Sequence, residues 1–346
     1  MSSTLSWILS SPCTRRGERY YLTLNRYLHF SSVINATLAF FGITKLLSLR
    51  LNRDKIAVLI NKSSKFLDLE TCDEENIIAD CKAYNSIITT MLRVLVAALF
   101  GNILVFNAAA VLLGDGDVSL LTIYKPSFVP GFIMYLGQNY VLVLVVTAVV
   151  AHDGILITCI IMAQVQFKLI NNKLAKLFVK NQQYRKNDFD KSIKECVDHH
   201  NYLLEFVSYT NRTFSSTLLA YLAIVILAMC VEFYTVSKQI SLEATLKALI
   251  YISAVLFQLV CFNCMPGQLL TNETEKTSEV AFYSNWEEVS SPSVMCAVKM
   301  IIHRTQKPVF ISAGGILSIN MGTGMATLKT IFSYYMFLRT VTEVVD

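Results

Sequence analysis

The sequence has little charge. Asp, Glu, Lys and Arg make up 16% of its 346 residues, whereas 54% of the residues are hydrophobic. An ordinary soluble domain carries about 25% charged residues. This deficit excludes a typical soluble domain and predicts a membrane protein with several spans.

The sequence also lacks the motifs of common enzyme classes. It contains no Gly-rich phosphate loop, no HExxH helix and no nucleophile elbow. No Gly/Ser-rich or Pro-rich linker separates a second domain. We therefore expect one membrane-embedded domain over residues 1–346, with no enzymatic activity, no catalytic residue, no cofactor, no metal and no nucleic-acid partner.

The cysteines do not form the pattern of a secreted, disulfide-bonded domain. Nine cysteines are scattered through the chain, mostly inside or beside apolar segments. Cys261 and Cys264 have CxxC spacing, but no second Cys/His pair accompanies them. We interpret them as small apolar residues one turn apart on a buried helix.

What the sequence does have is long apolar runs. A hydrocarbon core about 30 Å thick needs roughly 20 helical residues. Lipid offers no partner to unpaired backbone groups, so each span should be a helix. The sequence therefore predicts an all-α, polytopic bundle with six spans: Phe30–Leu49, Ile87–Leu113, Tyr140–Val165, Phe214–Val236, Leu246–Met265 and Ile316–Val341.

Positive charge alternates between the connections, and Lys/Arg-rich connections normally stay in the cytoplasm. Gln166–Arg212 and Gly267–Pro308 are rich in Lys and Arg, whereas Gly114–Asn139 contains only Lys125. The connection after the first span is also basic, with Lys45, Arg50, Arg53, Lys55, Lys62 and Lys65. These basic connections should be cytoplasmic and the carboxyl terminus extracellular, which leaves an Arg-bearing amino-terminal segment outside.

Ionisable residues inside or near the spans leave two interpretations open. His152 and Asp153 lie within the third span, where charged groups are expensive and face protein or water. They form either a buried polar contact between helices or part of a ligand or ion path. His199 and His200 lie in a cytoplasmic helix, where ordinary polar packing is favoured over a metal or acid–base site.

The last span, with "TLKTIFSYYMFLRT", is unusually polar for a lipid-embedded helix. Lys329, Ser333, Phe337 and Thr340 follow helical spacing and share one face. Such a stripe either packs against helices of the same subunit or borders a water-filled pathway with a hydrophobic constriction.

Three ordered motifs in the carboxyl-terminal part resemble the insect odorant receptor family of ligand-gated cation channels. They are "GQLLTNETEKTSEVAFYSNW", "RTQKPVFISAGGILSIN" and "LKTIFSYYMFLRT". The family has seven spans with the amino terminus inside. Phe30–Leu49 then corresponds to the second helix and the family's first helix is not in this sequence, which accounts for the outward amino-terminal segment.

The resemblance implies three regions. An outer ligand-binding bundle covers about residues 30–165 and 214–265, and cytoplasmic anchor helices cover about 166–213 and 267–312. A cytoplasmic part of the last helix, about Pro292–Ser312, leads to a pore-lining part, about 316–341. In the family, four subunits meet around one pore.

The resemblance also implies functional residues. The pore-lining positions are Ser333, Phe337 and Thr340, with Phe337 at the constriction. Subunit anchor positions are His200, Trp286, Lys307 and Pro308. Odorant contacts are expected in the outer bundle, with plain packing as the alternative at each position: Ile103, Phe106, Asn107, Tyr140, Val143, Thr147 and Tyr251.

The expected function is the odorant-binding (tuning) subunit of a heteromeric odorant-gated cation channel. It detects small volatile molecules, works with the odorant receptor co-receptor in a heterotetramer, and contacts membrane lipid in the plasma membrane of olfactory sensory neurons. The co-receptor itself is disfavoured because Gln166–Arg212 is shorter than its corresponding loop. A gustatory receptor channel of the same superfamily, a G-protein-coupled receptor and a transporter are the alternatives.

Overall fold

The computed structural model describes residues 37, 39–66, 82, 86–87, 89–94, 96–101, 103–104, 130–179, 186–237, 242–284, 286, 291–307 and 309–345. Helices dominate this part of the chain, and the strands in it form a single two-residue pair. The all-α bundle predicted from the apolar runs is confirmed.

Two very long helices form the spine of the bundle: α5 (Gly131–Val179) and α6 (Lys186–Ser237). At 1.5 Å per residue each is about 75 Å long, more than twice the thickness of a hydrocarbon core. Each helix therefore crosses an apolar slab and continues well beyond it. Their extensions confirm the helices predicted in the basic connection between the third and fourth spans.

The third long run changes its helical geometry in the middle. α7 (Leu242–Phe257) continues into the π-helix η2 (Gln258–Cys264) and then into α8 (Met265–Tyr283). Pro266, at the start of α8, has no N–H and would crowd the carbonyl four residues earlier in an α-helix. The wider π turn accommodates it, and the Asn263 side chain donates a hydrogen bond to the Gln258 carbonyl at 3.2 Å.

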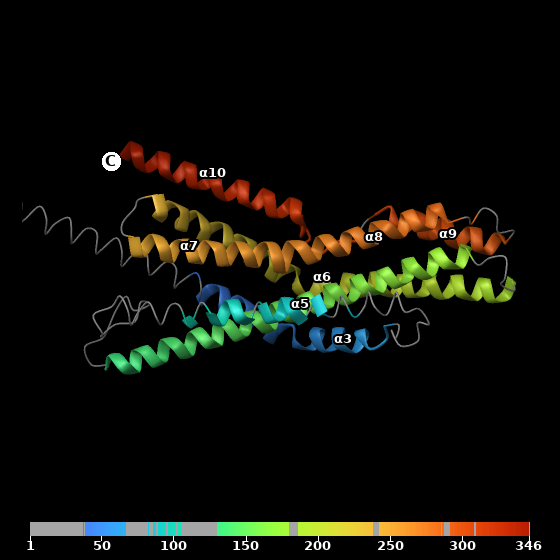
Figure 1. The fold of residues 1–346 in the computed structure, drawn as a ribbon, viewed down its shortest axis with the longest axis horizontal. Helices are drawn as coiled ribbons and strands as arrows, with labels where there is room; N and C mark the ends of the chain where they lie inside the picture. Colours follow the sequence, from blue (N-terminus) through green and yellow to red (C-terminus); the bar gives the residue numbers. More distant parts are fainter. Residues whose placement is uncertain are drawn as a thin grey trace, which may run out of the picture.

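The remaining helices pack around this framework. Residues 39–51 are helical and lead into α3 (Arg53–Ser63), while α9 (Pro292–Thr305) and α10 (Met321–Val345) follow α8. Figure 1 shows α9 beside α8 at one end of the molecule and α10 towards the other end, where it packs on α6 and η2. The bundle is thus elongated and has two distinct ends.

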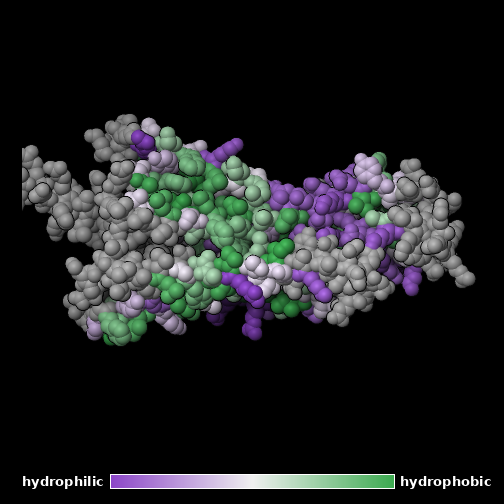
Figure 2. Space-filling model, viewed as in Figure 1, coloured by the Kyte–Doolittle hydropathy of each residue, from purple (hydrophilic) through white to green (hydrophobic). Residues whose placement is uncertain are grey.

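The two ends differ in surface chemistry. Figure 2 shows apolar surface gathered over the end that carries α7 and α10, and polar surface over the part that carries α8 and α9. Among the described residues, three helices are long and apolar enough to cross a membrane: Phe132–Leu177, Asp190–Tyr234 and Tyr251–Tyr283. A shorter apolar helix, Thr89–Gly101, lies within the predicted second span.

The predicted start of the last span is wrong. Residues 316–320 are not helical; instead β1 (Ser312–Ala313) pairs with β2 (Leu317–Ser318) in a hairpin, and α10 begins at Met321. Gly314 and Gly315 have φ angles of 63° and 71°, which interrupt a right-handed helix. The cytoplasmic helix expected to reach Ser312 also ends earlier, with α9 at Thr305.

The hairpin is fastened to the middle of α6. The Ser312 N–H donates to Asn211 Oδ1 at 2.8 Å, and the Gly314 N–H donates to the Ser215 carbonyl at 2.9 Å. Ala313 is fully buried, and a Cβ on Gly314 would lie 2.6 Å from a methyl of Leu219. The Ala-Gly pair that carried part of the family resemblance therefore fits a close contact with α6.

The hairpin offers a matched pair of glycine substitutions. Gly314→Ala and Gly315→Ala both incur the cost of a side chain at positive φ, roughly 1–2 kcal/mol. The Cβ added by Gly314→Ala also collides with the Leu219 side chain, whereas a Cβ at position 315 would have no atom within 4 Å. We expect Gly314→Ala to lower the thermal stability of the purified receptor more than Gly315→Ala, and Leu219→Ala to narrow the difference. Equal losses for the two glycine variants would show that the contact is unimportant.

Candidate functional site

A cavity of about 120 Å³ lies within the apolar half of the bundle, between the helix of residues 39–51, the segment that carries Ala98 and Ile103, α5, α6, α7 and η2. Its walls are almost entirely aliphatic and aromatic; the polar exceptions are Gln258 and the hydroxyls of Tyr221 and Tyr251. The lining residues are Phe41, Ala98, Leu99, Ile103, Leu142, Val145, Val146, Val149, Tyr221, Ile224, Val225, Ala228, Tyr251, Ala254, Val255, Phe257, Gln258 and Phe262. Concave, mainly apolar sites with few polar groups are typical of small-molecule binding.

Helical periodicity decides which side of α5 faces the cavity. Leu142, Val145, Val146 and Val149 follow one face and line it. A Cβ on Gly42 would lie 2.6 Å from the Val145 side chain, so a glycine at this position lets the first described helix approach α5 closely. This close approach closes one side of the cavity.

The predicted ligand contacts divide into three groups. Ile103 and Tyr251 line the cavity. Tyr140, Val143 and Thr147 are exposed on another face of α5 and do not line it. Phe106 and Asn107 lie outside the described residues. Because α5 is apolar on all sides here, the sequence does not show which side faces inward. The predicted contacts therefore lie on the side of α5 next to the one that lines the cavity.

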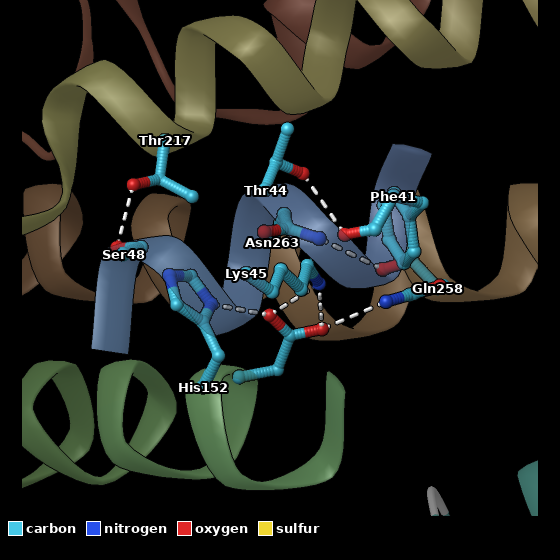
Figure 3. A network of polar contacts seen from close by, with 9 residues as sticks. Phe41, Thr44, Lys45, Ser48, His152, Thr217, Gln258 and Asn263 are labelled. Carbon is cyan, nitrogen blue, oxygen red and sulfur yellow. Dashed lines mark hydrogen bonds and ion pairs between the residues drawn. The ribbon is translucent and has the colours of Figure 1, made fainter. Parts of the chain in front are cut away.

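A buried ion pair lies next to the cavity. Lys45 Nζ is 2.6 Å from both carboxylate oxygens of Asp153 on α5. Gln258 Nε2 of η2 donates to Asp153 Oδ2 at 2.7 Å, and His152 Nδ1 is 3.0 Å from Asp153 Oδ1. Figure 3 shows Lys45, Gln258 and His152 arriving from three different helices. Of the two interpretations of "AHDG", the buried polar contact between helices is found.

The lysine of this pair corrects one prediction. Lys45 was counted among the cytoplasmic charges after the first span, but it is helical and only 2% exposed. Its ammonium lies 4.3 Å from the centroid of the Phe41 ring and 5.1 Å from that of Tyr221, both of which line the cavity. The available signal was that Lys45 lies inside an apolar run, where a charged side chain needs a buried partner.

Glu232 is a second ionisable residue that the sequence reasoning missed. It lies on α6, one turn beyond the cavity-lining Ala228, and is 1% exposed. Its Oε2 atom has no hydrogen-bond partner within the part of the chain that the structure describes. An acidic residue within the apolar run "LAMCVEFY" was again the available signal.

The elements that build the cavity also hold α10. Phe262 of η2 lines the cavity, while Cys264 of the same π-helix packs against Gly324, where a Cβ would lie 3.0 Å from its sulfur. Phe233 of α6 stacks on Phe332 of α10 with ring centroids 5.1 Å apart. Cys264 is therefore a buried packing residue at a helix crossing, as its spacing with Cys261 suggested.

The polar stripe of α10 faces away from the other helices that the structure describes. Ser333 and Thr340 are exposed and Phe337 is 63% exposed, whereas Ile331 on the other side is fully buried against the bundle. Within the part of the chain that the structure describes, these residues are therefore not packed against helices of the same subunit.

The polar end of the bundle has its own core, where the ends of α5, α6 and α8 pack with α9. Its buried residues are Leu174, Leu177, Ile193, Cys196, Ala281, Val294, Val298 and Ile301.

Predicted anchor positions lie at different depths. Trp286 packs partly buried against this second core, His200 is buried against Phe167, Lys307 is exposed, and Pro308 lies outside the described residues. His199 Nε2 lies 2.9 Å from Gln166 Oε1, in keeping with polar packing. No group of three His, Cys, Asp or Glu that could hold a metal was found among the described residues.

An apolar cavity inside an all-α, multi-pass membrane bundle is typical of a small-molecule binding site. Comparison with known families identifies it further: residues 29–332 match the family model described as 7tm Odorant receptor. The chain belongs to the insect odorant receptor family. It is a receptor rather than an enzyme, and this membership excludes the other receptor and transporter classes considered above.

Individual relatives agree with this assignment. The chain is 25% identical over 332 residues to odorant receptor 13a of Drosophila melanogaster, which covers 89% of this chain and 79% of that protein. It is 21% identical over 147 residues to odorant receptor 22b of the same species, which covers 42% of this chain and 36% of that protein.

Solved structures share the fold. The insect olfactory receptor OR5 from Machilis hrabei matches with a TM-score of 0.75 at 15% identity, over 89% of this chain and 80% of that one. The same receptor in complex with eugenol matches with a TM-score of 0.72, also at 15% identity, over 91% of this chain and 82% of that one.

Substitution at the buried ion pair should destabilise the receptor. Lys45→Met leaves the buried Asp153 carboxylate without its positively charged partner. Breaking a buried ion pair in this way lowers the free energy of unfolding by about 3–5 kcal/mol. We expect little folded Lys45→Met receptor at the cell surface, and partial recovery in Lys45→Met/Asp153→Asn. The control is Lys173→Met, whose partner Glu195 is 3.1 Å away at a half-exposed site, where the loss is roughly 0–1 kcal/mol. Similar surface levels for both single variants would contradict the role of the buried pair.

Proposed function

We propose that this chain is the odorant-binding subunit of a heteromeric odorant-gated cation channel, assembled with the family's co-receptor in the plasma membrane of olfactory neurons. The observation that carries the proposal is an apolar cavity whose walls include α6 and η2, the two elements that also pack against α10. This arrangement connects a ligand site to the helix with an exposed polar stripe.

The cavity favours a small volatile ligand. Its aliphatic and aromatic lining stabilises a ligand through burial of apolar surface, about 25 cal/mol per Å² removed from water. Few polar groups face the space, so a charged or strongly hydrated molecule would lose more solvation than it regained. The eugenol complex of the related receptor supports the assignment of an odorant as ligand.

The π-helix provides a direct route from cavity to α10. A ligand in the cavity contacts Phe262 of η2, and Cys264 of the same segment contacts Gly324 of α10. Odorant binding then stabilises the arrangement of α7, η2 and α10 that fits the ligand better, which shifts the population of channel states.

The exposed stripe of α10 supports assembly around a pore. Ser333, Phe337 and Thr340 are exposed, so they are accessible to neighbouring subunits and to water. Four such helices around one axis would place hydroxyls along the pathway and Phe337 at its constriction. The second hydrophobic core, where α8 and α9 meet α5 and α6, provides a rigid anchor for that assembly.

Filling the cavity should abolish the response to odorants. Val146→Phe places extra volume in the cavity from a residue that is 6% exposed. Val143→Phe adds the same volume on the exposed side of α5 and is the matched control. With both variants at the cell surface beside the co-receptor, odorant-evoked current should be lost in Val146→Phe and kept in Val143→Phe. The reverse pattern would place the ligand on the face that the sequence selected and refute the cavity.

Truncating the proposed constriction should loosen the gate. Phe337→Ala removes the large apolar group from the exposed stripe, so unliganded current should rise several-fold as the barrier to hydrated ions falls. Phe332→Ala, an aromatic truncation on the side of α10 that packs on Phe233, is the control and should leave that current near its original level. Unchanged current in Phe337→Ala channels would argue against Phe337 as the gate.

A further inference from the structure

Two residues of the cavity wall are also exposed. Phe257, the last residue of α7, lines the cavity and is 40% exposed, and Ala98 lines the cavity and is exposed as well. Facing the cavity does not account for this exposure, because the lining residues Val149, Tyr221 and Val225 are only 3% to 4% exposed. Most of the exposed surface of Phe257 therefore lies on the outside of the bundle.

The two exposed wall residues belong to one side of the cavity. Leu99, next to Ala98, lines the cavity and packs against the cluster that contains Phe262 of η2. The Phe262 ring meets the Phe257 ring edge-on, with centroids 5.6 Å apart. On the side between the segment of Ala98 and the end of α7, a single side chain thus separates the cavity from the outside.

This thin part of the wall faces the hydrocarbon of the bilayer. Phe257 lies at the opposite end of α7 from Leu242, where the helix begins, so it is about 22 Å along the helix and deep within the apolar half of the bundle. Around Ala98 the exposed surface is apolar, with Val94 and Phe100 both 42% exposed. A wide apolar surface at this depth is one that lipid covers.

Small apolar molecules are abundant where this wall meets the lipid. Transfer from water into hydrocarbon is favourable by about 25 cal/mol per Å² of apolar surface, so a volatile ligand is more concentrated beside Phe257 than in water. The ring is exposed on its outer side, and exposed side chains change rotamer within nanoseconds. Rotation of this one ring would open the cavity without moving a helix.

We propose that volatile ligands enter and leave the cavity sideways from the bilayer, through a lateral portal between the segment of Ala98 and the end of α7, and that the Phe257 side chain covers this portal. The proposal rests on the proposed function and adds the route of the ligand to it. A barrier on the route changes the rates of association and dissociation by the same factor, so it leaves the affinity unchanged.

The test measures how fast a ligand acts and washes out in the intact receptor beside the co-receptor. The probe is the uncharged volatile that evokes the largest current in a panel that includes eugenol. Ala98→Trp covers the portal and should slow both the onset and the wash-out of the current several-fold, with little change in half-maximal concentration. Ala97→Trp is the matched control, because Ala97 is exposed but does not line the cavity, and it should leave both rates unchanged.

Uncovering the portal should have the opposite effect. Phe257→Ala should speed both onset and wash-out, whereas Leu249→Ala, a truncation on α7 at a residue that is 49% exposed and does not line the cavity, should not. Unchanged rates in Ala98→Trp would overturn the inference, as would equal rates in Phe257→Ala and Leu249→Ala. A higher half-maximal concentration in Ala98→Trp with unchanged rates would also overturn it. Failure of the surface-expressed channel to respond to any volatile would instead refute the proposed function.

Discussion

The ion pair between Lys45 and Asp153 is the interaction on which the apolar half of this receptor depends. Both side chains are nearly inaccessible, so neither charge is solvated by water, and each is tolerable only because the other is 2.6 Å away. Gln258 and His152 occupy further sites on the carboxylate. The network therefore joins the first described helix, α5 and the π-helix at one point, and fixes their register where hydrophobic packing alone would allow sliding.

The cavity follows from that junction. Its lining includes Gln258, which belongs to the network, and Phe41 and Tyr221, whose rings flank the Lys45 ammonium. Moving any one of the joined helices changes both the network and the cavity wall. Because η2 also touches α10 through Cys264 and Gly324, a single structural unit contains the ligand space, the buried charges and the attachment of the proposed pore helix.

Much of the architecture could be predicted because a lipid bilayer requires each spanning helix to be apolar over about 20 residues. Apolar length predicted the third and fourth spans, which the long helices α5 and α6 contain. The rotation of a helix about its own axis was harder to predict. On α5 nearly every residue from Tyr140 to Val150 is apolar, so the sequence has no polar face to mark the outside; Val143 was chosen, whereas Val145 and Val146 line the cavity. On α10 the polar stripe left two interpretations open, and its members Ser333, Phe337 and Thr340 are exposed in the structure.

The sequence by itself determined the class of the protein, the helical fold and the family, because composition, span length and ordered motifs are local properties of the chain. Only the tertiary structure decided that Lys45 is a buried partner of Asp153 rather than a loop charge. It also decided that residues 316–320 precede the last helix, and that the rings of Phe41 and Tyr221 meet at the wall of one cavity. Each of these depends on residues far apart in sequence, and no local pattern records which distant group will meet a given side chain.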